Sequence, residues 1–124
     1  MKHLILLRHA KSSWNNPELD DLERPLNKRG KRASGDLAKW FRQQGWAPDE
    51  VLCSPALRTR ETLERLKLDA TPEIREDIYE APPGALFGAL QGAGGETLMM
   101  VGHNPGIGAL AQILARAKPE HPRF

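Results

Sequence analysis

The sequence predicts an α/β fold in which helices cover both faces of a mostly parallel sheet. Short apolar segments alternate with helical segments along the 124 residues, and this alternation is typical of parallel sheets. The first apolar segment is continuous, as expected of a strand that is covered on both faces. The length suffices for one hydrophobic core and is too short for two, so we expect one three-layer α/β/α domain over residues 1–124.

The chain begins with the apolar strand His3–Leu7, which leads into a polar segment, 10–30, rich in asparagine, proline and glycine. A loop of this length in a compact domain is usually functional. Apolar residues at helical spacing predict a helix over Lys31–Gln44, with Gly45 as its C-cap and Trp40 in the core. The remaining elements that we predict are a strand over Glu50–Cys53, a helix from about Ala56 to Leu66, a short strand around Glu73–Arg75, a helix over Pro83–Gln91, a strand over Thr97–Val101 and a helix from about Ile107 to Ala117.

The composition argues against several classes of protein. Hydrophobic residues make up 40% of the chain and charged residues 27%, and the formal net charge is +2, so no broad basic face recommends nucleic acid or a membrane as partner. The one cysteine, Cys53, rules out an internal disulfide framework and fits a reducing compartment. The apolar run Leu4–Leu7 is too short for a signal peptide, and no stretch is long enough to span a bilayer. We therefore expect a soluble, cytoplasmic protein.

Basic side chains follow three of the predicted strands. In open parallel sheets the ligand crevice lies beyond the carboxyl ends of the strands. The first strand ends in Arg8 and His9. The turn after the second strand leads to Arg58 in the first turn of a helix, and the last strand leads to His103. Two histidines and two arginines from three segments are thus expected to meet at one edge of the sheet.

This predicted cluster is suited to phosphate chemistry. The guanidinium group of arginine is always charged and matches phosphate oxygens in pairs. Neighbouring guanidinium charges disfavour a protonated imidazole, so a histidine among them stays neutral and nucleophilic near neutral pH. Such a histidine can attack phosphorus, and the covalent intermediate splits hydrolysis into two easier steps. Cationic side chains here take the role that magnesium often has, so we expect neither a metal nor a cofactor.

Four segments of the sequence, "LLRHAKSSW", "PLNKRGKRAS", "LCSPALRTRET" and "MMVGHNPGI", resemble successive motifs of the histidine phosphatase superfamily. They are most similar to those of the small SixA-like protein-phosphohistidine phosphatases, and they follow the family's order from Lys2 to about Leu114. The resemblance implies a phosphoglycerate-mutase-like fold.

The resemblance also implies a role for individual residues. His9 becomes the phosphorylated nucleophile. Arg8, Arg58 and His103 surround the phosphate, and Lys11 is expected to touch the substrate.

The acid that protonates the leaving group is less well defined by the resemblance. Glu80, in "IYEAPPG", lies where such an acid could reach, and Asp77 is its rival. Small SixA-like proteins do not all have a clear acid. A phosphoramidate leaves readily once its imidazole is protonated, so it needs less general-acid help. Glu80, Asp77 and no acid at all stay open as alternatives.

The C-terminal end departs from the pattern of similar SixA-like proteins. Those proteins continue past a segment resembling "HPRF" with further strand-forming sequence, whereas this sequence stops at Phe124. Either the chain is cut short or it naturally lacks edge elements. A missing edge strand would leave backbone groups unpaired and invite self-association, so we expect a monomer or a weak dimer.

The resulting hypothesis is a metal-independent phosphatase with a phosphohistidine intermediate and a role in signal transduction. Its expected substrate is phosphohistidine on a protein partner, such as a phosphotransfer domain, because short connections after the second and last strands leave no lid. The alternatives are hydrolysis of a small phosphomonoester and, in another class, a non-catalytic phosphate- or phosphohistidine-binding module. A zinc site is not expected because the histidines lack ligand-like spacing. A basic run next to the long loop is interpreted as a solvated face rather than a substrate-docking site; it comprises Lys28, Arg29, Lys31 and Arg32.

Overall fold

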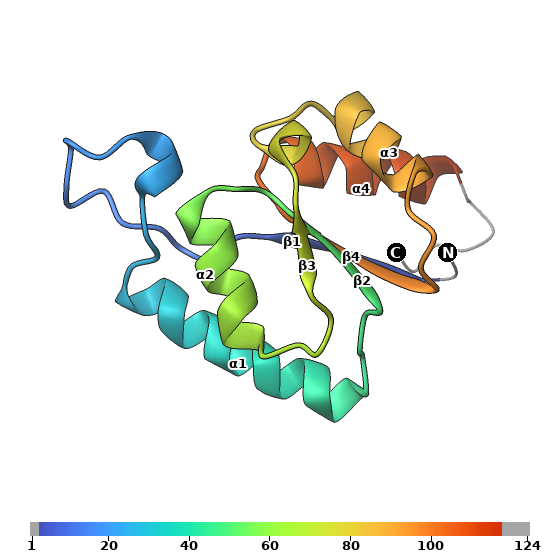
Figure 1. Cartoon of the computed structure of the whole chain (residues 1–124), viewed down its shortest axis with the longest axis horizontal. Helices are drawn as coiled ribbons and strands as arrows, with labels where there is room; N and C mark the ends of the chain where they lie inside the picture. The colour runs from blue at the N-terminus through green and yellow to red at the C-terminus, as the bar shows by residue number, and fades with distance from the viewer. Residues whose placement is uncertain (1–2, 118–124) are drawn as a thin grey trace.

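Figure 1 shows the computed structural model of the protein, which describes residues 3–117. The strands are β1 (His3–Arg8), β2 (Glu50–Cys53), β3 (Pro72–Ile74) and β4 (Thr97–Gly102). The α-helices are α1 (Lys28–Gln44), α2 (Leu57–Leu66), α3 (Pro83–Gln91) and α4 (Gly106–Ala117). Two short 3-10 helices are η1 (Asp21–Glu23) and η2 (Glu76–Ile78). Every predicted strand and α-helix is present, and no boundary is shifted by more than three residues.

The four strands form one parallel sheet in the order β1-β4-β2-β3. β1 pairs with β4 along its whole length, and the last pair of this ladder joins Arg8 to Gly102. On the other side of β4, the last pair with β2 joins Cys53 to Val101. The carboxyl ends of these three strands therefore lie level with one another. This alignment brings the residues that follow the strands to one edge of the sheet.

Helices cover both faces of the sheet, which confirms the predicted α/β/α layers. α1 and α2 lie on one face, and α3 and α4 lie on the other (Figure 1). Alternate residues of a strand point to opposite faces, and β4 shows the result. Met99 and Val101 pack in the core beneath α1 and α2, whereas Leu98 and Met100 pack in the core with α3 and α4.

Helix α1 begins three residues earlier than the sequence predicts. The side chain of Asn27 caps it by accepting a hydrogen bond from the backbone N–H of Gly30 at 2.8 Å. The apolar periodicity of the helix starts only later, so periodicity alone missed this polar first turn. The four basic residues of the run at 28–32 are exposed there, as expected of a solvated face.

Trp40 does not lie in the core, so that prediction is wrong. Its side chain is 42% exposed, whereas the neighbouring Phe41 is buried. Successive residues of a helix point about 100° apart, so only one of the two can face the sheet. Trp40 instead packs edge-on against Trp46 at the surface, with 4.8 Å between ring centroids.

The segment 118–124, which bears on the expectation about the C-terminal end, lies outside the described residues. Within the described residues, β1 and β3 form the two edges of the sheet. None of the helices in the described range is both long and apolar enough to cross a membrane.

Candidate active site

His9 follows β1 directly, and its backbone and ring are both fixed by hydrogen bonds. Its backbone N–H donates to the carbonyl oxygen of Gly102 at 3.1 Å, which extends the pairing with β4. Its Nδ1 atom lies 2.7 Å from the carbonyl oxygen of Ala10. Because a carbonyl oxygen can only accept, Nδ1 carries the proton. In the neutral ring, Nε2 therefore keeps a free lone pair.

Arg58 lies in the first turn of α2 and is 1% exposed. Its Nη1 donates to the backbone carbonyl of Asp21 at 2.6 Å, and its Nη2 donates to the carboxylate of Asp21 at 2.8 Å. The Nε–H of Arg58 is the buried side-chain polar group within residues 3–117 that has no hydrogen-bond partner. A buried donor without an acceptor costs about 1–3 kcal/mol. This N–H is therefore a donor that the described chain leaves unsatisfied next to Asp21 and His103.

His103 follows β4 and completes the predicted cluster. It is 4% exposed, and its ring centroid lies 5.3 Å from that of His9. Its Nδ1 lies 3.3 Å from Nη2 of Arg58, and its Nε2 lies 2.8 Å from Oγ of Ser54. Arg58 can only donate, so Nδ1 accepts and Nε2 donates to Ser54. Both ring nitrogens are engaged, and in this arrangement His103 orients Arg58.

Burial and positive charge both keep the two histidines neutral. Burial lowers the pKa of His103 to about 4, and the charge of Arg58 acts in the same direction. The pKa of His9 also lies below its ordinary value, chiefly through burial and then through the charges of Arg58, Arg8 and Arg24. The hydrogen bond to Ala10 opposes this shift only in part. At neutral pH, the neutral form of the His9 imidazole is thus favoured.

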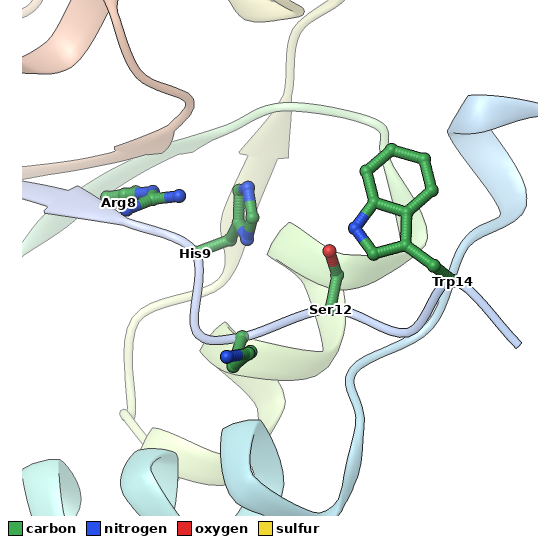
Figure 2. Close-up of a pocket in the computed structure, with 5 residues that line it drawn as sticks. Arg8, His9, Ser12 and Trp14 are labelled. Carbon is green, nitrogen blue, oxygen red and sulfur yellow. The ribbon is translucent and has the colours of Figure 1, made fainter.

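Arg8 and Lys11 line a pocket of about 320 Å³ together with His9, Ser12 and Trp14 (Figure 2). Within residues 3–117, no hydrogen bond or ion pair of this structure engages the Arg8 side chain, which is exposed. Lys11 is exposed as well. Both cations therefore remain available to an anion in the pocket, next to the free Nε2 of His9.

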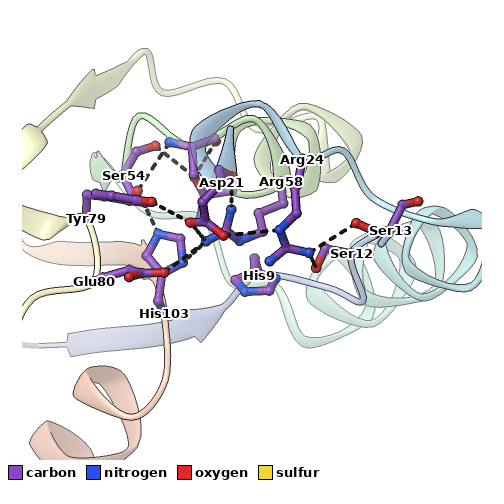
Figure 3. A network of polar contacts seen from close by, with 12 residues as sticks. His9, Ser12, Ser13, Asp21, Arg24, Ser54, Arg58, Tyr79, Glu80 and His103 are labelled. Atoms are coloured by element: carbon purple, nitrogen blue, oxygen red, sulfur yellow. Dashed lines mark hydrogen bonds and ion pairs between the residues drawn. The ribbon is translucent and has the colours of Figure 1, made fainter. Parts of the chain in front are cut away.

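Asp21 and Tyr79 belong to the site, although the sequence did not single them out. Asp21 accepts from Tyr79 Oη and from Arg58, as Figure 3 shows. Partial burial acts to raise the pKa of Asp21, but the hydrogen bonds from Tyr79, Arg58 and Arg24 outweigh it and hold that pKa far below its ordinary value. Burial and the Asp21 carboxylate raise the pKa of Tyr79 to about 12. Asp21 is consequently an ionised partner of Arg58 and a poor proton donor.

Arg24 is the third arginine of the site and was also missed. It is buried, and its Nη1 donates to Oγ of Ser12 at 2.8 Å and to the carbonyl oxygen of Ser13 at 3.1 Å. Its Nε donates to Oδ1 of Asp21 at 3.1 Å. The one available signal was an arginine placed just before the motif "PLNKRGKRAS". Its burial depends on the path of the loop, which no local pattern reveals.

The two candidate acids differ in their surroundings. An oxygen of Glu80 lies 3.4 Å from Nη2 of Arg58, and its side chain is 56% exposed. Glu80 has a φ of 48°, a left-handed conformation that is uncommon for a residue other than glycine. Asp77 instead binds Nε and Nη2 of Arg75 at 3.0 and 2.6 Å. The geometry thus brings Glu80 to the cluster and leaves Asp77 engaged with Arg75.

This arrangement can bind a phosphoryl group beside a neutral nucleophile. In the pocket, Arg8 supplies a free cation and His9 supplies a lone pair. Arg58 does not line the pocket, and its buried Nε–H is an unsatisfied donor in the same cluster. In the part of the chain that the structure describes, no three His, Cys, Asp or Glu side chains form a group that could hold a metal ion. Cys53 is buried, and burial raises the pKa of its thiol to about 11, so it is an unreactive core residue.

Comparisons with known proteins show the family to which the chain belongs. A family model of the histidine phosphatase superfamily (branch 1) matches residues 4–91. An uncharacterised protein of Mycobacterium tuberculosis is 40% identical over 111 residues, which is 88% of this chain and 70% of that protein.

Solved structures of SixA proteins are similar over most of the chain. SixA from Nakamurella multipartitia has a TM-score of 0.89 and 29% identity, over 99% of this chain and 73% of that one. The protein histidine phosphatase SixA complexed with tungstate has a TM-score of 0.75 and 27% identity, over 87% of this chain and 73% of that one. These likenesses confirm the predicted phosphoglycerate-mutase-like fold. The chain therefore belongs to the histidine phosphatase superfamily (branch 1) and is SixA-like, which identifies it as a hydrolase of the phosphatase class.

Proposed function

We propose that this protein is a metal-independent phosphatase that removes phosphate from phosphohistidine on a protein partner, with His9 as the covalent nucleophile. The observation that carries the proposal is the hydrogen bond from Nδ1 of His9 to the carbonyl oxygen of Ala10. It fixes the tautomer so that Nε2 presents a lone pair within the pocket lined by Arg8.

In the first step, Nε2 of His9 attacks phosphorus, and a new N–P bond forms while the P–N bond of the substrate breaks. The bonding pair goes to the leaving imidazole nitrogen, which takes up a proton. In the second step, water attacks the phosphohistidine on His9, the N–P bond breaks, and inorganic phosphate and neutral His9 result. Arg8 and Arg58 stabilise the charge on the phosphoryl oxygens in both steps.

Within this mechanism the other site residues have supporting roles. His103 and Asp21 hold the buried guanidinium of Arg58 in place through their contacts with it. Glu80 is the proposed proton donor to the leaving group, since its carboxyl group lies at the cluster and is more than half exposed, whereas that of Asp77 is paired with Arg75. Lys11, which lines the pocket, is proposed to contact the substrate phosphate.

A protein substrate is supported by the short connections around the site. Only residues 54–56 separate β2 from α2, and only residues 103–105 separate β4 from α4. Neither connection is long enough to form a lid over the pocket. A SixA relative is named as a protein histidine phosphatase, and its complex with tungstate, a phosphate-like oxyanion, supports anion binding in this fold.

Hydrolysis of a small phosphomonoester is the second candidate. It is favoured by the contact between Glu80 and Arg58, because an ester needs an acid for its leaving oxygen more than a phosphoramidate does. A non-catalytic binding module is disfavoured, since such a module has no use for a neutral histidine with a free Nε2 in the pocket.

The test compares phosphate release from three substrates by the wild type, His9→Ala and His3→Ala. The substrates are a phosphohistidine-bearing phosphotransfer domain, free phosphohistidine and a panel of small phosphomonoesters. His3 is a matched control because it is an exposed histidine at the other end of β1. The same reactions are run with EDTA, and acid-labile phosphate on His9 is sought by mass spectrometry of the intact protein.

We expect release chiefly from the phosphotransfer domain, unaffected by EDTA and by His3→Ala, and reduced by at least about 10³-fold in His9→Ala. Preference for a small ester would replace the proposed substrate with the second candidate. A folded wild-type protein that binds phosphohistidine but turns over none of the substrates would support the binding module instead.

A further inference from the structure

Trp14 is an exposed aromatic residue at the pocket that the proposed mechanism leaves without a role. Its side chain is 75% exposed, the highest value among the large hydrophobic residues of the described chain. It nevertheless lines the same pocket as His9, and Figure 2 shows both side chains projecting from the loop to the same side, with Ser12 between them. An exposed tryptophan beside a nucleophile is a candidate contact for a ligand.

The indole ring is held in position despite its exposure. The guanidinium carbon of Arg24 lies 3.5 Å from the centroid of the ring, within the range of a cation–π contact. Arg24 is itself buried and anchored by three oxygen acceptors, from Ser12, Ser13 and Asp21. The large exposed fraction of Trp14 means that the ring surface away from Arg24 is uncovered. The loop therefore holds the indole ring at the pocket with much of its surface uncovered.

This surface suits the leaving group of one class of substrate. When phosphate lies beside His9 and Arg8, the group attached to phosphorus must lie elsewhere in the same pocket, opposite the attacking nitrogen. In phosphohistidine that group is a planar imidazole, which can stack on an indole. Ammonia or an aliphatic alcohol offers no ring to stack.

We infer that Trp14, backed by Arg24, is a specificity-determining residue that contacts the imidazole ring of the phosphohistidine substrate. The inference rests on the proposed function, and it names the residue of that same site that contacts the leaving group. Trp14 contributes binding that is nearly the same in the ground state and the transition state. Its loss therefore raises KM for ring-bearing substrates more than it lowers kcat.

The experiment compares two substrates that share a P–N bond and differ only in the ring, 1-phosphoimidazole and phosphoramidate. The variants are Trp14→Leu, which keeps apolar bulk, and Trp14→Phe, which keeps an aromatic face. Trp46→Leu is the matched control, since Trp46 is an exposed tryptophan that packs against Trp40 in α1. Binding of both compounds is also measured calorimetrically in the His9→Ala background, which separates recognition from turnover.

We expect Trp14→Leu to raise KM for 1-phosphoimidazole by about fivefold, which is the effect of losing one aromatic contact. The KM for phosphoramidate should not change. Trp14→Phe should keep most of the affinity, and Trp46→Leu should have no effect. Equal changes for the two substrates, or no change for either, would overturn the inference. Absence of turnover by the wild type would count against the proposed function alone. Ring-selective binding in the His9→Ala background that depends on Trp14 would still support the contact.

Discussion

At the scale of single residues, the site is organised around one buried cation. Arg58 is almost fully buried, and burying a charge is costly unless partners compensate it. Its compensation comes from Asp21 in the loop after β1 and from Glu80 after η2. A variant that removes the Asp21 carboxylate therefore leaves a buried charge short of a partner as well as a less ordered arginine.

The depressed pKa of His103 makes the stability of the protein depend on pH. The unfolded chain protonates this histidine near the ordinary value of 6.5, whereas the folded protein keeps it neutral down to about pH 4. Between these values the unfolded state binds more protons, so stability rises with pH through this window and is fully present above 6.5. The stability lost by pH 4 amounts to a few kcal/mol, at about 1.4 kcal/mol per pKa unit.

Urea unfolding from pH 7.5 to 4.5 measures this loss. We expect the free energy of unfolding of His103→Gln to fall less steeply with decreasing pH than that of the wild type, whatever its stability at pH 7.5. The exposed control His3→Gln should follow the wild type. Parallel curves for the wild type and His103→Gln would contradict the assignment.

At the scale of elements, the start of α1 is fitted against the loop that carries the site. A Cβ atom on Gly30 would lie 2.1 Å from the carbonyl oxygen of Lys11, so only glycine permits this approach. The same carbonyl accepts a hydrogen bond from the backbone N–H of Asn27 at 2.9 Å. Ser12 then pairs with Leu26 in an antiparallel bridge. Helix α1 thus fixes the backbone that positions the pocket residues Lys11 and Ser12.

Two glycines of α1 provide a matched pair of substitutions. Gly30→Ala forces the helix and the loop apart because the clash is with backbone, and we expect a loss of about 1–3 kcal/mol of stability together with impaired activity. Gly35→Ala meets nothing within 4 Å and should stabilise the helix by about 0.5–1 kcal/mol without affecting activity. Thermal and urea unfolding measure the stability of both variants, and phosphate release measures their activity. Equal effects of the two variants would show that the close approach is unimportant.

At the scale of the whole molecule, positive charge is concentrated at the site while the chain as a whole is nearly neutral. The net charge is only +2, yet Arg8, Arg24 and Arg58 all lower the pKa of His9. The charges around His9 therefore favour the approach of an anion to the site. Because a ligand that binds only the folded state stabilises it, anion binding can be read from the melting temperature.

At a concentration about 100-fold above its Kd, tungstate should stabilise the folded wild type by about 2.7 kcal/mol. This stabilisation should raise the Tm by several degrees. Arg8→Gln removes a free cation from the pocket and should require at least about 10-fold more tungstate for the same rise. Arg42→Gln, at the far end of α1, is the charge-matched control and should behave like the wild type. A wild-type Tm that tungstate leaves unchanged, or an Arg8→Gln variant with the wild-type response, would contradict an anion site at Arg8.

The sequence by itself determined the order of the elements and the meeting of Arg8, His9, Arg58 and His103. Alternating strands and helices dictate a parallel sheet, and a parallel sheet brings the carboxyl ends of its strands to one edge. Arg8 is the last residue of a strand, and the other three residues follow a strand within five positions, so a short-range pattern was enough to place them.

Tertiary structure alone decided what surrounds those residues. Asp21, Arg24 and Tyr79 lie in or directly after the short 3-10 helices of two connecting segments. The paths of these segments depend on distant contacts: Asp21 binds Arg58 and Tyr79, which are 37 and 58 residues away in the chain. Tertiary structure also decided which face of α1 is buried, because Trp40 is exposed whereas its neighbour Phe41 is buried. The spacing of apolar residues indicates whether a segment is a helix or a strand. A loop has no repeating geometry from which a contact can be predicted.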